Sequence, residues 1–328
     1  MKDTFSLIWK IKVIFMDKKI LAIIAIIIVA IVAVGAYFAL GSSDDTITIG
    51  HLPSDHDTAM YVAEAQKQYE AQGLKVETVQ FNNGGDLMTA MASGDVDVGY
   101  VGITPVLSSI EKGVPVKVVS GAQIEGSGVV VGTNSGINSL ADLKGKKVGT
   151  PGAATIQNMI ITYGLNQSGV DVKDVELVSM KAAQMTDALK AGQIDAMICW
   201  EPFSSIAVKK GYGKLLENTS EIIPGHPCCV VAARQDFIDK HPEDLKKILA
   251  IHENATKFTN ENPKEAAALL PEDIVPDKDL QASIIEDTEF VSGLDADYKQ
   301  NVMDFMQLGV DLGLLKEPIS EDKIFAKV

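Results

Sequence analysis

The segment MTAMASGDVD at Met88–Asp97 has a counterpart in TDALKAGQID at Thr186–Asp195. Each segment predicts a helix that ends on glycine, followed by a strand that is entered through aspartate. Two unrelated helix ends are the alternative interpretation, because glycine is common directly after a helix. If the two segments are instead copies of one repeat, they predict a chain with two related α/β units.

Apolar segments alternate with helical segments around the first copy. The predicted strands have apolar or alternating residues and lie at 46–52, 74–81, 96–101 and 116–122. Helices are predicted at 58–72, 86–93 and 105–112, with Asp57 as the N-cap of the first and Pro105 at the start of the third. This alternation predicts parallel strands joined by right-handed crossovers.

The same alternation starts again further along the chain. Strands are predicted at 147–150, 175–179, 196–199 and 228–233, and helices at 155–168 and 184–191. After Gln235 the pattern is helical, at 242–262, 263–270, 278–285 and 298–312. Two α/β units and a helical tail are therefore predicted, and His241 and His252 are expected to be solvated in that tail.

Composition excludes several classes of protein. The 328 residues carry a formal net charge of −15 and include one arginine, Arg234, so the basic surface of a nucleic-acid binder is missing. Three cysteines are too few for a disulfide framework, and their spacing is not that of a zinc site. Cys228 and Cys229 would point to opposite faces of an extended strand, where they are expected as small buried residues; a bond between them is the alternative.

An uncharged segment of 21 residues, Ile20–Leu40, follows a basic N-terminus. A helix of this length spans about 32 Å, which is enough to cross a bilayer. Residues 1–19 carry a net charge of +3, so a cytoplasmic stub, a transmembrane anchor at 20–40 and an extracytoplasmic globular part are predicted. A cleaved signal peptide is the alternative, although its apolar region is usually shorter. Met16 is an alternative start.

Motifs for catalysis, nucleotide binding and metal binding are missing from the sequence. His56 lies between Asp55 and Asp57, but adjacent residues rarely converge on one ion. No catalytic residue, no metal ligand and no cofactor is therefore predicted.

Four loops at the predicted carboxyl ends of strands are the expected ligand site. They lie at 53–57, 82–86, 102–105 and 151–155, and each leads into a helix that offers free N–H groups. Trp200 would stand at the end of another strand as an aromatic wall, or else belong to the core. The predicted ligand-binding residues are Ser54, Asp55, His56, Asp57, Asn83, Gly84, Gly102, Ile103, Thr104, Gln123, Gly152, Ala153, Ala154, Thr155, Trp200 and Glu201.

Five segments resemble the nitrate/sulfonate/taurine-type solute-binding proteins of ABC importers. They are TITIGHLPSDHDTAMYVAEAQ (46–66), SGDVDVGYVGITP (93–105), DLKGKKVGTPGAAT (142–155), LKAGQIDAMICWEPF (189–203) and GHPCCVVAARQDFIDKHPE (225–243). The resemblance implies the type II periplasmic binding fold, an α/β fold with a ligand cleft between two lobes. It places lobe one at 46–124 plus 227–328 and lobe two at 125–226. It also implies two partners besides the solute, a permease and its ATPase.

The solute itself is only partly restricted by the residues. No arginine fork lies in the predicted loops, so capture of a carboxylate as in amino-acid binders is not expected. Helix N-termini favour an anion, whereas Asp55, Asp57 and Glu201 suit an amine, so a zwitterionic or neutral polar solute meets both conditions. Sulfonate, taurine, nitrate or a related solute is expected.

Two other functions stay open at this point. Some proteins of this fold are enzymes that act on pyrimidine or menaquinone precursors, although the synthases among them resemble a cysteine-rich motif that this chain lacks. A sensor ectodomain is the second alternative, although no signalling domain follows in the sequence.

Overall fold

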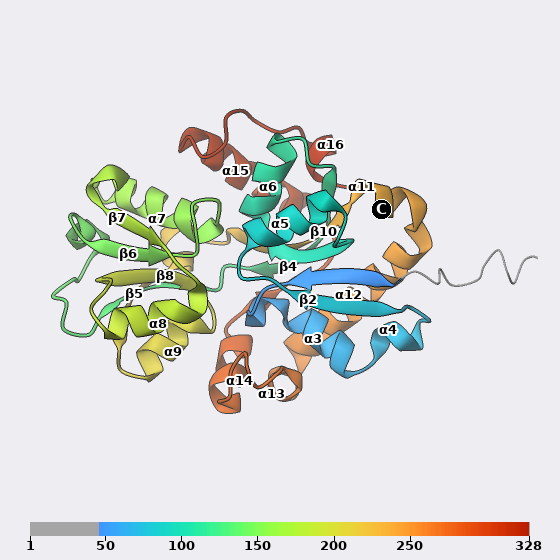
Figure 1. Cartoon of the computed structure of the whole chain (residues 1–328), viewed down its shortest axis with the longest axis horizontal. Coiled ribbons are helices and arrows are strands. Elements are labelled where there is room, and N and C mark those ends of the chain that lie inside the picture. Colours follow the sequence, from blue (N-terminus) through green and yellow to red (C-terminus); the bar gives the residue numbers. More distant parts are fainter. Residues whose placement is uncertain (1–45, 328) are drawn as a thin grey trace, which may run out of the picture. The chain divides into compact units, whose positions relative to one another are not determined.

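The computed structural model describes residues 46–327 (Figure 1). Within these residues, no helix combines the length and the apolar character needed to cross a membrane. The predicted basic stub at 1–19 and the predicted anchor at 20–40 lie outside the described residues.

Eleven strands of the described chain form two separate mixed sheets. The first sheet has the order β11-β4-β10-β3-β1-β2 and contains β1 (Ile47–His51), β2 (Val76–Gln80), β3 (Val98–Gly102), β4 (Val116–Ile124), β10 (Pro227–Arg234) and β11 (Glu289–Phe290). The second has the order β7-β6-β8-β5-β9 and contains β5 (Ser127–Gly132), β6 (Lys147–Thr150), β7 (Glu176–Ser179), β8 (Ala196–Trp200) and β9 (Gly213–Asn218). We call each sheet with its helices a lobe.

The expectation of parallel strands is wrong for one inner strand of each sheet. β1, β2 and β3 pair in parallel, as do β6, β7 and β8. β10 is antiparallel to β3 and β4, and β5 is antiparallel to β8 and β9. Both are the first strand after the chain passes from one sheet to the other. The chain then arrives where the parallel strands end, so its next strand must run in the opposite direction.

The helices cover the faces of both sheets. On the first half of the chain they are η1 (Asp55–Asp57), α3 (Thr58–Ala65), α4 (Gln68–Ala71), α5 (Gly84–Ser93), α6 (Ile103–Glu111), η2 (Leu140–Leu143) and α7 (Ile156–Gln167). Between residues 172 and 240 they are η3 (Val172–Asp174), α8 (Ala182–Lys190), α9 (Phe203–Lys209), α10 (Thr219–Ile222) and α11 (Gln235–Lys240). The tail contains α12 (Pro242–Glu261), α13 (Pro263–Leu269), α14 (Lys278–Glu286), α15 (Ala296–Asp311) and α16 (Glu321–Ile324). Figure 1 shows this orange and red tail on the first lobe, where α12 and α13 contact α3.

Two expectations about the helices need correction. The helix predicted at 58–72 is divided into α3 and α4, because Lys67 adopts a left-handed conformation, with φ of 55°. His252 on α12 is not solvated but buried: its Nε2 lies 2.8 Å from the Gly121 carbonyl and its Nδ1 lies 3.1 Å from the Tyr100 hydroxyl. Folding of the tail onto the first sheet covers this face of α12.

Two short segments connect the lobes. The first is Glu125 and Gly126 between β4 and β5, and both residues have positive φ. The second runs from α10 to β10. The Gly225 N–H donates to the Glu125 carboxylate at 2.6 Å, and the Glu125 N–H donates to the His226 carbonyl at 3.2 Å, so the two segments are tied to each other. The lobe boundaries predicted after residues 124 and 226 stay predictions. The strands show which residues belong to each sheet, but they do not show about which residues the lobes rotate.

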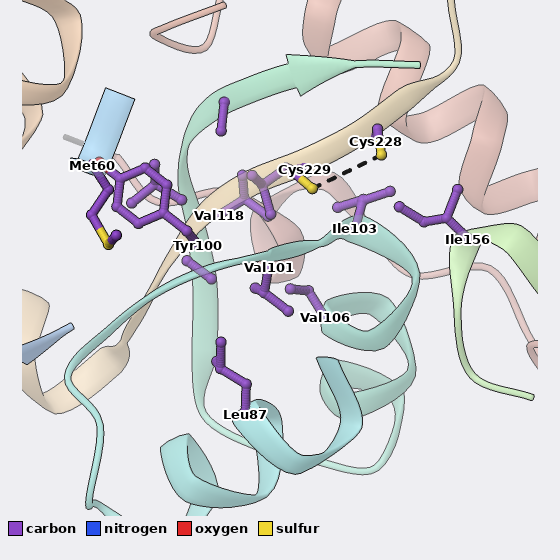
Figure 2. Packing of buried hydrophobic residues seen from close by; sticks show 14 of the residues in the cluster. Met60, Leu87, Tyr100, Val101, Ile103, Val106, Val118, Ile156, Cys228 and Cys229 are labelled. Carbon is purple, nitrogen blue, oxygen red and sulfur yellow. Dashed lines mark hydrogen bonds between the residues drawn. The ribbon is translucent and has the colours of Figure 1, made fainter. Parts of the chain in front are cut away.

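The apolar core has two clusters of buried side chains. The larger one fills the first lobe and continues into the second, and Figure 2 shows part of it around Tyr100, Val101 and Ile103. Ile156, from α7 of the second lobe, lies beside Ile103 in this view. The smaller cluster lies in the second lobe and includes Trp200. Apolar contacts across the cleft therefore help to hold the lobes together in this structure.

Candidate solute-binding cleft

A small cavity lies where strands of both sheets end. Its volume is about 30 Å³, room for one or two water molecules. The loop after β1, the starts of α5, α6 and α7, and the ends of β3 and β8 contribute to it. It is lined by Leu52, Ser54, His56, Asp57, Gly84, Gly102, Pro105, Thr155, Ile156, Gln157, Trp200, Cys228 and Cys229.

The segment after β1 is buried in spite of its polar side chains. Asp57 occupies the N-cap position of α3, as predicted, but its side chain does not cap the helix: the carboxylate instead accepts a hydrogen bond from the Leu52 N–H at 2.9 Å. Ser54 is the N-cap of η1, because its hydroxyl accepts from the His56 N–H at 3.1 Å. Asp55 accepts from the Gln281 side chain at 3.1 Å, so α14 holds the outer side of this segment.

The start of α7 is the main contribution of the second lobe. The Thr155 hydroxyl caps the helix by accepting from the Asn158 N–H at 3.3 Å, and it donates to the Gly152 carbonyl at 2.7 Å. The Gln157 side chain donates to the Ser127 hydroxyl at 3.0 Å. Thr155, Ile156 and Gln157 all line the cavity, so a helix N-terminus faces it.

Trp200 is both core and cavity wall. Its side chain is buried and stacks edge-to-face on Phe203, with ring centroids 6.4 Å apart. Its Nε1 has no hydrogen-bond partner among the described residues. The neighbouring Glu201 is turned away from the cavity, since its carboxylate accepts from the Ser205 N–H and hydroxyl, both at 3.0 Å.

The lobes contact each other directly at this cleft. The Ser54 hydroxyl donates to the Glu201 carbonyl at 3.0 Å, and His56 Nε2 lies 2.7 Å from the Gly126 carbonyl oxygen. These contacts hold the two lobes together, and the space left between them at this point is only about 30 Å³. A solute larger than one or two waters can enter only when the lobes separate.

The predicted ligand-binding residues divide into two groups. Seven of them line the cavity: Ser54, His56, Asp57, Gly84, Gly102, Thr155 and Trp200. The other nine are not among the residues that line it: Asp55, Asn83, Ile103, Thr104, Gln123, Gly152, Ala153, Ala154 and Glu201. Asn83 caps α5 by accepting from the Asp86 N–H, and Gln123 is buried at the end of β4.

Cys228 and Cys229 are cavity residues that were expected to be ordinary core. A β-bulge of β10 changes their direction: Pro227 pairs with Ile124 and Cys229 with Gln123, so Cys228 is an extra residue in the ladder. Both sulfurs therefore lie on one side, 3.9 Å apart (Figure 2). Each sulfur is 3.6 Å from His56 Nδ1. No sequence signal marks this bulge.

Burial shifts the ionisation of the acidic residues at the cleft. It raises the pKa of Asp55 to about 7 and the pKa of Asp57 to about 7, and it also raises the pKa of Glu201. Burial alone would lower the pKa of His56, but the Cys229 sulfur and the Asp55 carboxylate stabilise the charged ring and raise its pKa to about 9. Shifted ionisable groups in a cleft are typical of binding sites and active sites.

Comparison with known proteins supports both the fold and the family. The ligand-binding component of an ABC-type import system from Staphylococcus aureus, solved with zinc bound, has a TM-score of 0.77 at 22% identity over 86% of this chain and 97% of that one. The periplasmic aliphatic sulphonate-binding protein of Escherichia coli has a TM-score of 0.72 at 20% identity over 87% and 93%. These likenesses confirm the predicted α/β type II periplasmic binding fold.

Sequence relatives lead to the same family. The taurine-binding periplasmic protein of Escherichia coli is 27% identical over 214 residues, which are 64% of this chain and 65% of that protein. The NMT1-like family model matches residues 41–271, more than two thirds of the chain. The chain therefore belongs to the NMT1-like family, which confirms its relation to the solute-binding proteins of ABC importers.

Proposed function

We propose that the chain is the solute-binding component of an ABC importer that captures a small sulfonate-type solute and delivers it to a permease and its ATPase. One observation carries this proposal: strand ends and helix N-termini from both lobes meet at one small pocket. A site divided between two lobes can close around a solute by a hinge movement. The names of the relatives support the solute class.

The chemistry of the cavity favours a zwitterion such as taurine. No lysine or arginine is among the described residues that line the cavity, so an anionic group must be held by N–H donors. The starts of α5, α6 and α7 supply such donors and the positive end of a helix dipole. Asp57 and the nearby Asp55 can attract an ammonium group. A sulfonate at the helix N-termini and an amine near the aspartates satisfy both parts of the cleft.

Opening of the cleft is needed before binding. The segments at 125–126 and 219–226 are the connections about which the lobes can rotate. The inter-lobe bonds of Ser54 and His56 would break on opening and form again around the solute. A bound solute thus replaces part of the direct contact between the lobes.

The proposed site of action is outside the cytoplasm, with residues 20–40 as the anchor. The full-length chain should then remain with the membrane fraction after a high-salt wash, and external protease should reach its globular part. A mature form that begins near Ser42 in the soluble fraction would indicate a cleaved signal instead.

A ligand screen of the full-length chain tests the binding proposal. Taurine, alkanesulfonates, nitrate, bicarbonate and pyrimidines are added at matched ionic strength, and thermal unfolding is followed. A true solute stabilises the folded protein by about 2.7 kcal/mol at a hundredfold excess over its dissociation constant. The absence of a shift with every compound would contradict the proposed solute class. Chemical conversion of a compound would favour the enzyme alternative.

A further inference from the structure

Three side chains that can bind a metal converge at the wall of the cavity. Cys228 and Cys229 come from β10 and His56 comes from η1, 172 and 173 residues away along the chain. Their ligand atoms all lie within 4.8 Å of one another, and all three residues are buried. Both cysteines are free thiols in this structure. The cluster is therefore a set of two sulfur ligands and one nitrogen ligand in a site sheltered from water.

The histidine is oriented as a metal ligand would be. His56 Nε2 lies 2.7 Å from the Gly126 carbonyl oxygen, so this nitrogen carries the proton and donates it. The other ring nitrogen, Nδ1, faces the two sulfurs, at 3.6 Å from each, and a metal ion bound there would take the place of its proton. Metal-bound histidines usually donate their second ring N–H to a carbonyl or carboxylate in this way.

The backbone beside the histidine leaves room only for glycine. Gly126 has a φ of +75°, and a Cβ atom there would lie 2.5 Å from His56 Nε2. Because Gly126 has no side chain, the imidazole of His56 can approach the Gly126 carbonyl. The resulting hydrogen bond fixes the orientation of the ring. The bulge at Cys228 has the complementary effect on β10, because it turns a second sulfur toward the same ring.

We propose that His56, Cys228 and Cys229 form a Zn²⁺ site with three protein ligands and a fourth position open to the cavity. Tetrahedral zinc with bonds of about 2.3 Å to sulfur and 2.0–2.1 Å to nitrogen separates two sulfurs by about 3.8 Å and sulfur from nitrogen by about 3.5 Å. The observed separations are 3.9 Å between the sulfurs and 3.6 Å from each sulfur to Nδ1. The three atoms thus already have nearly the spacing of three corners of a zinc tetrahedron.

The ligand set selects the kind of ion. Thiolate and imidazole favour Zn²⁺, whereas Mg²⁺ and Ca²⁺ prefer oxygen ligands. Two thiolates and a neutral imidazole around Zn²⁺ have no net charge, which suits a buried site. Because all three residues also line the cavity, water or a donor atom of the solute can take the fourth position. This inference goes beyond the proposed import function and does not depend on which solute binds.

Cobalt substitution tests the site on the full-length chain, purified under reducing conditions without a histidine tag and freed of metal by chelation. One Co²⁺ per chain should bind and give sulfur-to-cobalt charge-transfer absorption together with the visible bands of tetrahedral cobalt. Zn²⁺ should abolish these bands at one equivalent, and excess Mg²⁺ or Ca²⁺ should leave them unchanged. Absence of the bands, with no zinc retained on dialysis, would overturn the proposal.

Variants assign the ligands. Cys228→Ala, Cys229→Ala and His56→Gln should each weaken Zn²⁺ binding by about 100-fold or more. Cys199→Ala is the matched control, because Cys199 is the third buried free cysteine and belongs to the core of the second lobe; its zinc affinity should be unchanged. Cys228→Ser and Cys229→Ser, checked by circular dichroism, separate ligand loss from misfolding. Unchanged affinity in folded Cys228 and Cys229 variants would also overturn the site.

The zinc and solute measurements have independent outcomes. Zinc binding without any solute-induced thermal shift would support this site and contradict the proposed solute class. A solute-induced thermal shift in a protein that binds no zinc would support the proposed solute class and contradict the zinc site.

Discussion

Strands β3 and β8 hold equivalent places in the two lobes but end in opposite ways. Each has five residues, and each pairs in parallel with the strand that begins the parallel part of its sheet, β1 or β6. The entering aspartates also have the same role: Asp97 accepts from the Thr48 N–H at 2.9 Å, and Asp195 accepts from the Lys147 N–H at 2.8 Å. The repeated sequence segments thus correspond to a repeated scaffold.

The last residue of each strand shows how the lobes have diverged. β3 ends on Gly102, where an added Cβ would lie 3.0 Å from Ile156 of the other lobe, and β8 ends on Trp200. The first lobe therefore offers close backbone approach, together with the sulfur, imidazole and carboxyl groups of the cavity. The second lobe offers an aromatic side chain and a helix N-terminus. The same scaffold therefore places chemically reactive groups on the side of the first lobe and an aromatic side chain on the side of the second.

Removal of the aromatic wall should have the largest effect. Trp200→Ala should lower the free energy of unfolding by about 3–5 kcal/mol, because it empties a large buried volume. Solute affinity should also fall, since Trp200 lines the cavity. Urea unfolding and titration calorimetry measure the two effects. Trp200→Phe is the control, with smaller losses expected; a loss below about 1 kcal/mol with unchanged affinity would mean that Trp200 is neither core nor wall.

Acid should weaken the contribution of one buried group of the first lobe, His252. None of the five histidines lies between residues 127 and 218, which contain the second sheet. Burial lowers the pKa of His252 from 6.5 to about 4, so its stabilising effect is complete above pH 6.5 and is lost as pH falls toward 4. The loss at this one group amounts to about 3 kcal/mol.

A double difference isolates His252 from the other titrating groups. The free energy of unfolding is measured for the natural chain and for His252→Gln, at pH 7 and at pH 4. The difference between the two proteins should be about 3 kcal/mol smaller at pH 4 than at pH 7. Hydrogen exchange at pH 4.5 should show earlier opening around α12 and β3, because the His252 ring contacts the Tyr100 hydroxyl and the Gly121 carbonyl. A pH-independent difference would show that His252 is not the sensitive group.

Local sequence patterns predicted the scaffold well. β6 was predicted with its observed bounds, and α7 differs by one residue at each end, because Thr155 is a cap and Ser168 follows the helix. β5 and β9 were not predicted, since neither is followed directly by a long helix and β9 is partly exposed. Strand direction at β5 and β10 depends on where the chain crosses between lobes, and no local pattern contains that information.

The entering aspartates should differ in their importance for stability. Asp97 also forms an ion pair with Arg234 at 3.0 Å, and both side chains are only 18% exposed. Asp97→Ala should cost about 2–3 kcal/mol, because it leaves a partly buried arginine with less compensation. Asp195→Ala should cost about 1 kcal/mol, the value of one hydrogen bond. Equal losses in urea unfolding would indicate that the ion pair contributes nothing.

The cleft was less predictable than the scaffold. Loops at strand ends indicated Ser54, Gly102 and Thr155, because ligand sites of open α/β sheets lie at those ends. Gln157 is a cavity residue inside a helix, and Cys228 reaches the cavity only through a bulge. Their positions follow from long-range packing, which spacing along the chain does not reveal.

The smallest expected effect concerns the caps that follow the equivalent strands β1 and β6. Thr155→Ala removes the α7 cap and should cost about 1 kcal/mol of stability. Ser54→Ala removes the η1 cap and also the bond to the Glu201 carbonyl across the cleft. Both variants should bind solute more weakly, Thr155→Ala by about 1 kcal/mol for a neutral contact and up to about 3 for a charged one.

Small-angle scattering and calorimetry separate the two caps. Only Ser54→Ala should shift the free protein toward an open form, because only Ser54 bonds to the other lobe. Thr133→Ala is the matched control, since its hydroxyl is exposed and bonds to the Gly211 carbonyl away from the cleft; its solute affinity should be unchanged. If Thr155→Ala binds solute as tightly as this control does, the start of α7 is not part of the solute site, and the second lobe contributes Trp200 alone.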